Sequence, residues 1–120
     1  MARQEATYAG AALAGRLGDL PGWGERDGAI ERTYTTGGWP VTIMLVNAIA
    51  FLAEAADHHP DLSVSWGQVV VRLNTHSAGG ITDKDIELAR AIERQALWRP
   101  EGGALTGTTK KWVSGDAAAS

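Results

Sequence analysis

All three histidines of this 120-residue chain fall within nineteen positions, at His58, His59 and His76. Two carboxylates, Glu54 and Asp57, come shortly before the histidine pair. Imidazole has an unperturbed pKa near neutrality, so it can both donate and accept a proton under physiological conditions. Several imidazoles brought together beside carboxylates therefore predict proton-transfer chemistry on a small molecule, provided that the fold closes the gap between residues 59 and 76.

The histidine pair stands where a long apolar helix is expected to end. Pro60 pushes the residue before it out of the helical conformation, so we expect His59 to leave the helix while His58 still closes it. Glu54 lies four residues before His58, close enough on a helix surface for the carboxylate to hold and charge the imidazole. The alternative is an ordinary histidine at a helix end, interacting with the last carbonyl groups.

His76 ends a segment, residues 69–76, in which apolar side chains alternate with a second set, as on a strand with one buried face. Alone, it would be an ordinary histidine at a sheet edge. His76 can act together with His58 and His59 only if the end of this strand lies close to the end of the helix. Asp85 is either an acid that complements the dipole of the following helix, which is the default, or a support for the same site.

Other chemistries fit these residues less well. Three histidines and an aspartate could hold zinc, but adjacent His58 and His59 diverge, and no His-x-x-x-His spacing occurs. The chain has no cysteine, no serine in a nucleophile-elbow context and no glycine-rich phosphate loop. Trp66 is either a core residue or, being near the histidines in the sequence, a platform for a planar ligand.

Composition favours one globular domain without a strongly charged partner. The formal net charge is −3 and the basic residues are dispersed, so neither nucleic acid nor an anionic membrane is expected as a partner. The apolar run over residues 40–56 is interrupted by polar residues and falls short of the ~20 residues of a membrane span, so we interpret it as a buried helix. The absence of cysteine fits a cytoplasmic protein.

Hydrophobic periodicity and turn residues predict an α+β fold for residues 1–97. Helices are expected at about 7–18, 40–57 and 82–97, the last beginning with an acidic variant of the capping box at Thr82. Strands are expected from Trp23, over 29–36, over 62–66 and over 69–76, with Gly67-Gln68 as a two-residue hairpin turn. Residues 98–120 are interpreted as a tail, although Leu105 and Trp112 are apolar residues that a solvated tail would not need.

Around the histidines the chain resembles the pterin-4a-carbinolamine dehydratase family, over roughly residues 17–97. The pattern of that family is an acidic residue, then His-His-Pro, an aromatic residue, a further histidine and a downstream aspartate. The matching residues in this sequence are Glu54, His58, His59, Pro60, Trp66, His76 and Asp85.

The resemblance implies a four-stranded antiparallel sheet with helices packed on one face, in the order α-β-β-α-β-β-α, and assembly into homodimers or homotetramers. It also implies dehydration of a 4a-hydroxytetrahydropterin to the quinonoid dihydropterin, which recycles the pterin cofactor of aromatic amino-acid hydroxylases, without a metal or cofactor in the dehydratase itself. The catalytic residues would be His58, His59 and His76. Residues around the pterin would be Glu54, Asp57, Pro60, Trp66, Thr75, Ser77, Ala78 and Asp85.

A second hypothesis is that the chain is a non-catalytic adaptor. Some members of the family act as a dimerisation cofactor of a transcription factor, and carboxysome-associated relatives assist RuBisCO assembly, so RuBisCO would be the protein client in this interpretation. The complete set of acid–base residues favours the enzyme, because an adaptor has no physical need for three histidines.

Overall fold

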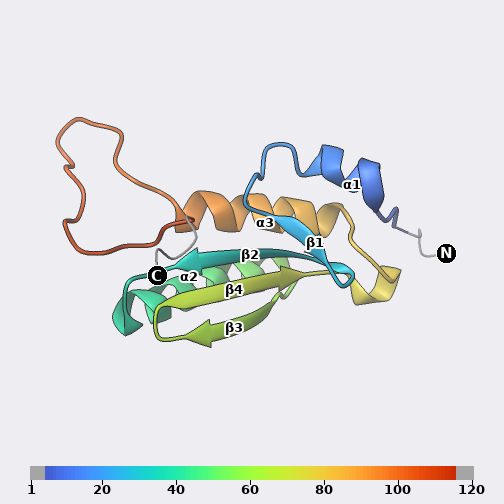
Figure 1. The fold of residues 1–120 in the computed structure, drawn as a ribbon, viewed down its shortest axis with the longest axis horizontal. Coiled ribbons are helices and arrows are strands. Elements are labelled where there is room, and N and C mark those ends of the chain that lie inside the picture. Colours follow the sequence, from blue (N-terminus) through green and yellow to red (C-terminus); the bar gives the residue numbers. More distant parts are fainter. Residues whose placement is uncertain (1–4, 116–120) are drawn as a thin grey trace.

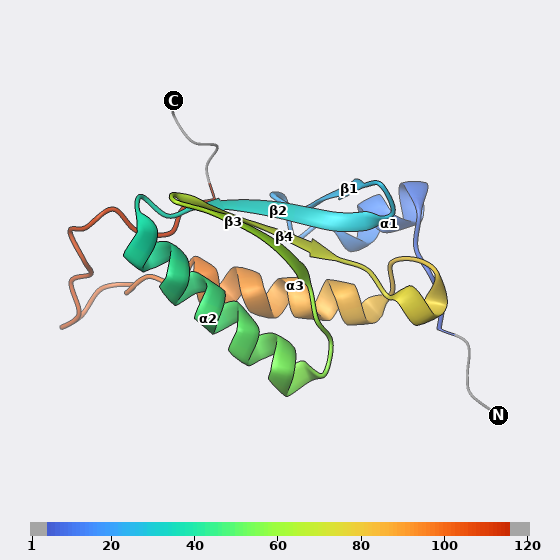
Figure 2. The same cartoon turned by 90° about the horizontal axis from the view of Figure 1, so that it is seen from below.

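The computed structural model describes residues 5–115 as an antiparallel sheet covered by helices. The elements are α1 (Gly10–Arg16), β1 (Gly24–Arg26), β2 (Ala29–Thr35), α2 (Trp39–Ala56), β3 (Asp61–Ser65), β4 (Gln68–Leu73), a 3-10 turn η1 (His76–Ala78) and α3 (Asp83–Ala96). The four strands pair in the order β1-β2-β4-β3, and α2 and α3 cross the same face (Figure 1, Figure 2). The predicted fold class and order of elements are confirmed.

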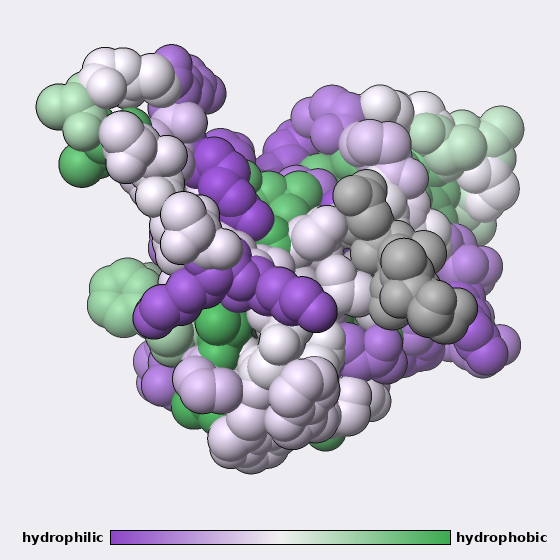
Figure 3. Space-filling view, turned by 60° about the vertical axis from the view of Figure 1, so that its left-hand side comes forward, coloured by the Kyte–Doolittle hydropathy of each residue, from purple (hydrophilic) through white to green (hydrophobic). Residues whose placement is uncertain are grey.

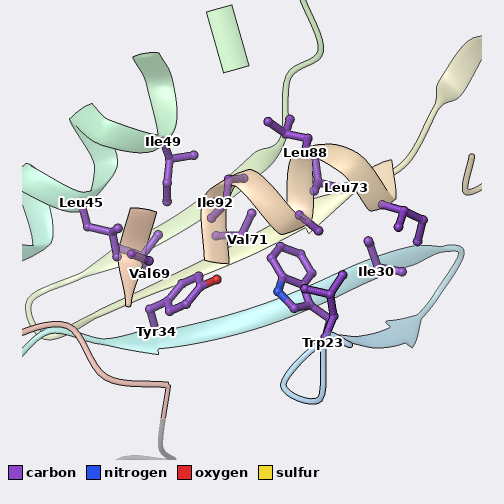
Figure 4. Packing of buried hydrophobic residues seen from close by; sticks show 14 of the residues in the cluster. Trp23, Ile30, Tyr34, Leu45, Ile49, Val69, Val71, Leu73, Leu88 and Ile92 are labelled. Carbon is purple, nitrogen blue, oxygen red and sulfur yellow. The ribbon is translucent and has the colours of Figure 1, made fainter. Parts of the chain in front are cut away.

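Alternation along the two central strands builds the core. In β4 the buried side chains are those predicted from the alternation, at positions 69, 71 and 73. They lie beside the buried side chains of β2 and face apolar side chains of the two long helices (Figure 4). The labelled core residues are Trp23, Ile30, Tyr34, Leu45, Ile49, Val69, Val71, Leu73, Leu88 and Ile92.

One inward-facing position of β2 is an arginine, which ties α3 to the sheet. The Arg32 guanidinium donates to both carboxylate oxygens of Glu93 on α3, at 3.1 and 3.2 Å, and stacks over the Tyr34 ring at 5.0 Å. The Tyr34 hydroxyl and the Trp23 indole N–H donate to the same carboxylate. Burial, together with the hydrogen bond to Glu93, raises the pKa of the Tyr34 hydroxyl, so it stays a donor at neutral pH.

Helix α2 buries only one side, which differs from the fully buried helix that its apolar composition suggests. Leu45 and Ile49 are in the core, whereas Met44 and Phe51 are 55% and 74% exposed. By length and composition α2 is the one helix of residues 5–115 that is long and apolar enough to cross a membrane, a test that core helices of soluble proteins also pass.

The predicted hairpin turn is wrong by one residue. Ser65 pairs with Gln68 across the end of β3 and β4, so the two turn residues are Trp66 and Gly67 instead of Gly67 and Gln68. The backbone N–H of Thr36 donates to the Gly67 carbonyl, and the Thr42 hydroxyl donates to the Trp66 carbonyl. These two hydrogen bonds fix the turn against the start of α2.

Residues 112–115 pack on the domain although they follow its predicted end. Val113 is 4% exposed, and Ser114 exchanges two backbone hydrogen bonds with Thr35 at the end of β2, at 2.9 and 2.8 Å. Arg32 also donates to the Gly115 carbonyl. Between α3 and this segment the chain leaves the body of the molecule as a long excursion (Figure 1).

Replacing Val113 with alanine tests whether this segment is part of the folded domain. Removing two buried methyl groups should lower the free energy of unfolding by about 2 kcal/mol. The matched control is Leu105→Ala, because Leu105 is apolar but 66% exposed and should change stability by less than about 0.5 kcal/mol. Urea denaturation of both variants gives the measurement, and equal stabilities would mean that the segment is not docked in solution.

Candidate active site

The histidine pair follows a left-handed residue that ends α2. Asp57 has φ 53° and ψ 41°, its backbone N–H donates to Glu54, and the backbone N–H of His58 donates to Ala53. This pair of hydrogen bonds is the Schellman arrangement, in which one residue in the αL conformation reverses the chain. The prediction that His58 closes the helix is therefore wrong, since α2 ends two residues earlier, at Ala56.

His58 turns inward from this corner onto a buried carboxylate. Its Nε2 lies 2.6 Å from Oδ1 of Asp85, and the Asp85 side chain is completely buried. This contact replaces the predicted pairing of His58 with Glu54, because the left-handed turn carries His58 away from the helix surface on which Glu54 stands. Asp85 thus has both roles that the sequence suggested for it: it supports the histidine, and it sits in the first turn of α3.

The second oxygen of Asp85 joins the helix to the end of β4. Oδ2 accepts hydrogen bonds from the Thr75 hydroxyl and from the Thr82 backbone N–H, both at 2.9 Å. The Thr75 and Thr82 hydroxyls are themselves 2.7 Å apart. With the Thr82 hydroxyl accepting from the backbone of α3, these contacts complete the predicted capping box. One carboxylate therefore holds His58 on one side and the residue before His76 on the other.

His59 and Glu54 form a second, exposed pair. The Nε2 of His59 lies 2.8 Å from Oε1 of Glu54, and the side chains are 57% and 82% exposed. Glu54 therefore orients His59, whereas the sequence predicted that it would orient His58. Asp57, which we expected to help orient the imidazoles, has the backbone role of ending α2.

His76, Ser77 and Ala78 form the 3-10 turn η1, inside the loop that the Thr75–Gly80 bridge closes. The backbone N–H groups of Ala78 and Gly79 donate to the Thr75 carbonyl at 3.0 Å, which fixes the turn. The His76 side chain is exposed. The predicted strand therefore ends at Leu73, and His76 projects from a tight turn instead of a strand.

Trp66 is placed far from the histidines, contrary to its predicted position in the site. It lies in the β3–β4 turn beside Gly38, at the start of α2, whereas His58 and His59 follow the end of α2. Pro60 comes directly before β3, so the whole strand separates it from Trp66. The sequence distance of a few residues is misleading here because an extended strand adds about 3.3 Å for each residue.

Lys84 is a neighbour of the site that sequence reasoning missed. It lines a groove between α2 and α3 together with His58, Leu52 and Leu88. Its ammonium lies 2.7 Å from the Glu5 carboxylate, and this hydrogen bond lowers the pKa of Glu5 and raises the pKa of Lys84. The only sequence signal for Lys84 was its position next to Asp85 in the capping box.

The arrangement is suited to proton transfer by imidazole. If Nε2 of His58 donates to the Asp85 carboxylate, Nδ1 is left to accept a proton in neutral imidazole or to donate one in imidazolium. Within residues 5–115, no group of three or more His, Asp and Glu side chains is close enough together to hold a metal ion.

Comparison with known proteins gives a consistent family assignment. The profile of the family described as pterin 4 alpha carbinolamine dehydratase matches residues 6–95. Provisionally named dehydratases of this kind from Roseiflexus sp. strain RS-1 and Aquifex aeolicus are 47% identical over 78 residues and 52% identical over 77 residues. These matches cover 65% and 64% of this chain, and 84% and 78% of the relatives.

Two solved structures resemble the fold. A protein from Brucella melitensis, described as a transcriptional coactivator/pterin dehydratase, has a TM-score of 0.69 and 30% identity, with 73% of this chain and 96% of that chain covered. A pterin dehydratase-like protein described as a RuBisCO assembly factor in the alpha-carboxysome has a TM-score of 0.53 and 16% identity, covering 62% and 87% of the two chains. The second likeness shows the fold alone.

Thr75→Val tests the contact that joins the two parts of the site. The substitution keeps the shape of the buried side chain but removes the donor to Asp85, so the free energy of unfolding should fall by about 1–3 kcal/mol. Thr33→Val is the control, because Thr33 is an exposed residue of β2. Thermal denaturation followed by circular dichroism compares the two variants, and equal losses of stability would contradict a special role for Thr75.

Proposed function

Because the chain belongs to the pterin 4 alpha carbinolamine dehydratase family, we propose that it is a hydro-lyase that converts 4a-hydroxytetrahydropterin to quinonoid dihydropterin and so recycles the pterin cofactor. The observation that carries the proposal is the Asp85 carboxylate, which binds His58 through one oxygen and Thr75, the neighbour of His76, through the other. Acid–base catalysis by these histidines requires that the residues after α2 lie close to those after β4. The contacts of Asp85 support that arrangement.

The reaction needs one acid and one base near a planar ring. As the C4a–O bond breaks, the hydroxyl oxygen takes a proton and leaves as water, while the N5 lone pair forms the C4a–N5 double bond. N5 then loses its proton, so the numbers of protons taken up and released are equal. We assign these two transfers to His58 and His76, and positioned groups of this kind typically each accelerate a reaction by about 10²–10⁴-fold.

The other residues would hold the pterin ring and orient the imidazoles. The buried, hydrogen-bonded Asp85 keeps the imidazole of His58 in one orientation. Glu54 does the same for the exposed His59, which would contact the substrate from the solvent side. The η1 backbone from Thr75 to Ala78 would present fixed carbonyl and N–H groups to the polar edge of the pterin.

His58→Ala and His76→Ala test the catalytic assignment. Each should lower kcat for dehydration of synthetic 4a-hydroxytetrahydropterin by at least about a hundredfold, because each removes one proton-transfer group. His59→Ala should raise KM more than it lowers kcat. His76 is exposed, so its variant should keep the stability of the parent protein. Near-normal kcat in both His58→Ala and His76→Ala would eliminate the proposed mechanism.

We also propose that the chain assembles with itself through the outer face of α2. Among residues 5–115, Phe51 has the most exposed large apolar side chain, and it lines a shallow groove with Asn47, Ala50, Glu54 and Ala55. A helix that presents an apolar stripe on both sides is expected to bury the second one against another surface. A second copy of α2, related by two-fold symmetry, would cover this stripe in a dimer or tetramer.

Phe51→Glu tests this interface. A charge at the centre of a self-complementary apolar stripe would have to be buried twice in a dimer, so the variant should sediment as a smaller species than the parent protein. Trp98→Glu is the control, because Trp98 is also an exposed aromatic residue and lies two residues after the end of α3. Analytical ultracentrifugation measures both, and an unchanged assembly in Phe51→Glu would place the interface elsewhere.

A second candidate function is that of an adaptor without catalysis. It is favoured by the packed segment 112–115, which lies beyond the part of the chain that matches the family profile, and by the fold shared with a protein described as a RuBisCO assembly factor. If the purified parent protein does not accelerate dehydration of 4a-hydroxytetrahydropterin, the adaptor role is the better assignment, with RuBisCO as the first client to test.

A further inference from the structure

Two grooves flank the end of the C-terminal excursion, at the end of the molecule where α2 begins. The turn groove, about 580 Å³, lies between Lys111–Trp112 and the β3–β4 turn residues Trp66 and Gly67. The helix groove, about 520 Å³, lies between the same Lys111–Trp112 segment and Pro40, Val41 and Met44 of α2. One side of each groove is formed by the C-terminal extension, residues 98–115, which lies outside the part of the chain that matches the family profile.

The position of Lys111 between the grooves is fixed by its surroundings. It packs so closely on Gly37, where φ is +78°, that a Cβ on residue 37 would lie 2.5 Å from the Cβ of Lys111. Two residues later Val113 is buried, and its carbonyl accepts a hydrogen bond from Arg99. The absence of a side chain at Gly37 therefore allows the extension to pack closely on the β2–α2 turn, and these contacts hold the extension in one place.

The grooves carry positive charge and no negative charge. Lys110 and Lys111 are among the residues that line them, and no Asp or Glu of residues 5–115 is, although the whole chain has a net charge of −3. Figure 3 shows this end of the molecule, with hydrophilic side chains crossing it and hydrophobic surface visible in the hollows beside them. A local positive patch on a negatively charged protein favours an anionic partner at this place.

Exposed aromatic and apolar side chains stand beside the lysines. Trp66 is 68% exposed, and Trp39 and Met44 are about half exposed at the start of α2. Tryptophan and methionine are enriched in protein interfaces, where a few such residues contribute most of the binding energy. The partner should therefore combine negative charge with an apolar side chain.

We propose that the turn groove and the helix groove bind an acidic peptide segment of another protein, in which carboxylates flank an aromatic or aliphatic side chain. The carboxylates pair with Lys110 and Lys111, and the apolar side chain enters the groove beside Trp66. Nucleic acid is a poorer fit, because two lysines neutralise only about two phosphates and the net negative charge of the chain repels the rest of the polymer. An acidic peptide needs only cationic side chains for its carboxylates and an apolar surface for its side chain, and the grooves supply both.

This binding surface is independent of the candidate active site. Helix α2 has 18 residues, so its two ends are about 27 Å apart. His58 follows its last turn, whereas the two grooves are at its first turn. Occupation of the grooves therefore leaves the histidines open, and the surface adds a partner to the proposed function.

The test uses the full chain and two synthetic peptides. One alternates glutamate with leucine and phenylalanine, and the other has every glutamate replaced by glutamine. Fluorescence anisotropy of labelled peptides at low salt should show saturable binding of the acidic peptide and at least about tenfold weaker binding of its glutamine counterpart. Lys111→Glu should raise the Kd for the acidic peptide about tenfold, because a paired charge becomes a repelling one.

The matched control is Arg26→Glu, which makes the same charge change at an exposed residue of β1, away from the grooves. It should change the Kd less than about twofold, and both variants should retain dehydration activity. The proposal is overturned if the acidic peptide does not bind, if both charge reversals weaken binding equally, or if phosphatidylserine vesicles or single-stranded DNA bind the grooves more tightly than the peptide.

Discussion

A carboxylate that is completely removed from water has to be surrounded by donors, and in this protein the Asp85 side chain is such a group. Its hydrogen-bond partners come from three parts of the chain: the Thr82 N–H before α3, the Thr75 hydroxyl after β4, and the His58 imidazole after α2. Loss of any one of them would leave buried charge or polarity uncompensated, at a cost of about 1–3 kcal/mol in the free energy of unfolding. These parts of the chain therefore have to meet, and the candidate site is where they meet.

A second carboxylate, Glu93, holds the same helix near its other end. It accepts hydrogen bonds from Arg32 and Tyr34 of β2 and from Trp23 before β1. Helix α3 is thus fixed to the sheet by hydrogen-bonded carboxylates near both ends, with apolar side chains between them. Such a helix gives little freedom to Asp85, and this rigidity passes to the orientation of His58. Positioned imidazoles need that kind of support to transfer protons efficiently.

The two ends of α2 carry different features of the protein. Its last residue leads into the histidine corner, which lies within the part of the chain that matches the family profile. Its first turn lies beside the C-terminal extension, with the lysines and exposed tryptophans that we assign to a peptide partner. Between them, the outer face of the helix exposes Phe51, which we assign to self-association. One helix therefore contributes to the proposed catalytic, assembly and recognition surfaces, at its last turn, its outer face and its first turn.

The sequence alone determined the class of fold, the order of elements and the buried face of β4, because alternation and capping are local patterns of period two or of adjacent residues. It also singled out the three histidines and Asp85. Only the tertiary structure decided which groups pair. A single left-handed residue, Asp57, moved His58 from Glu54 to Asp85, and the extended strand β3 placed Trp66 at the opposite end of α2. Val113 is buried because its neighbour Ser114 pairs with Thr35 at the end of β2, a contact that no pattern within residues 98–120 could reveal. Contacts between residues far apart in the chain arise from packing, and spacing along the sequence carries no direct record of them.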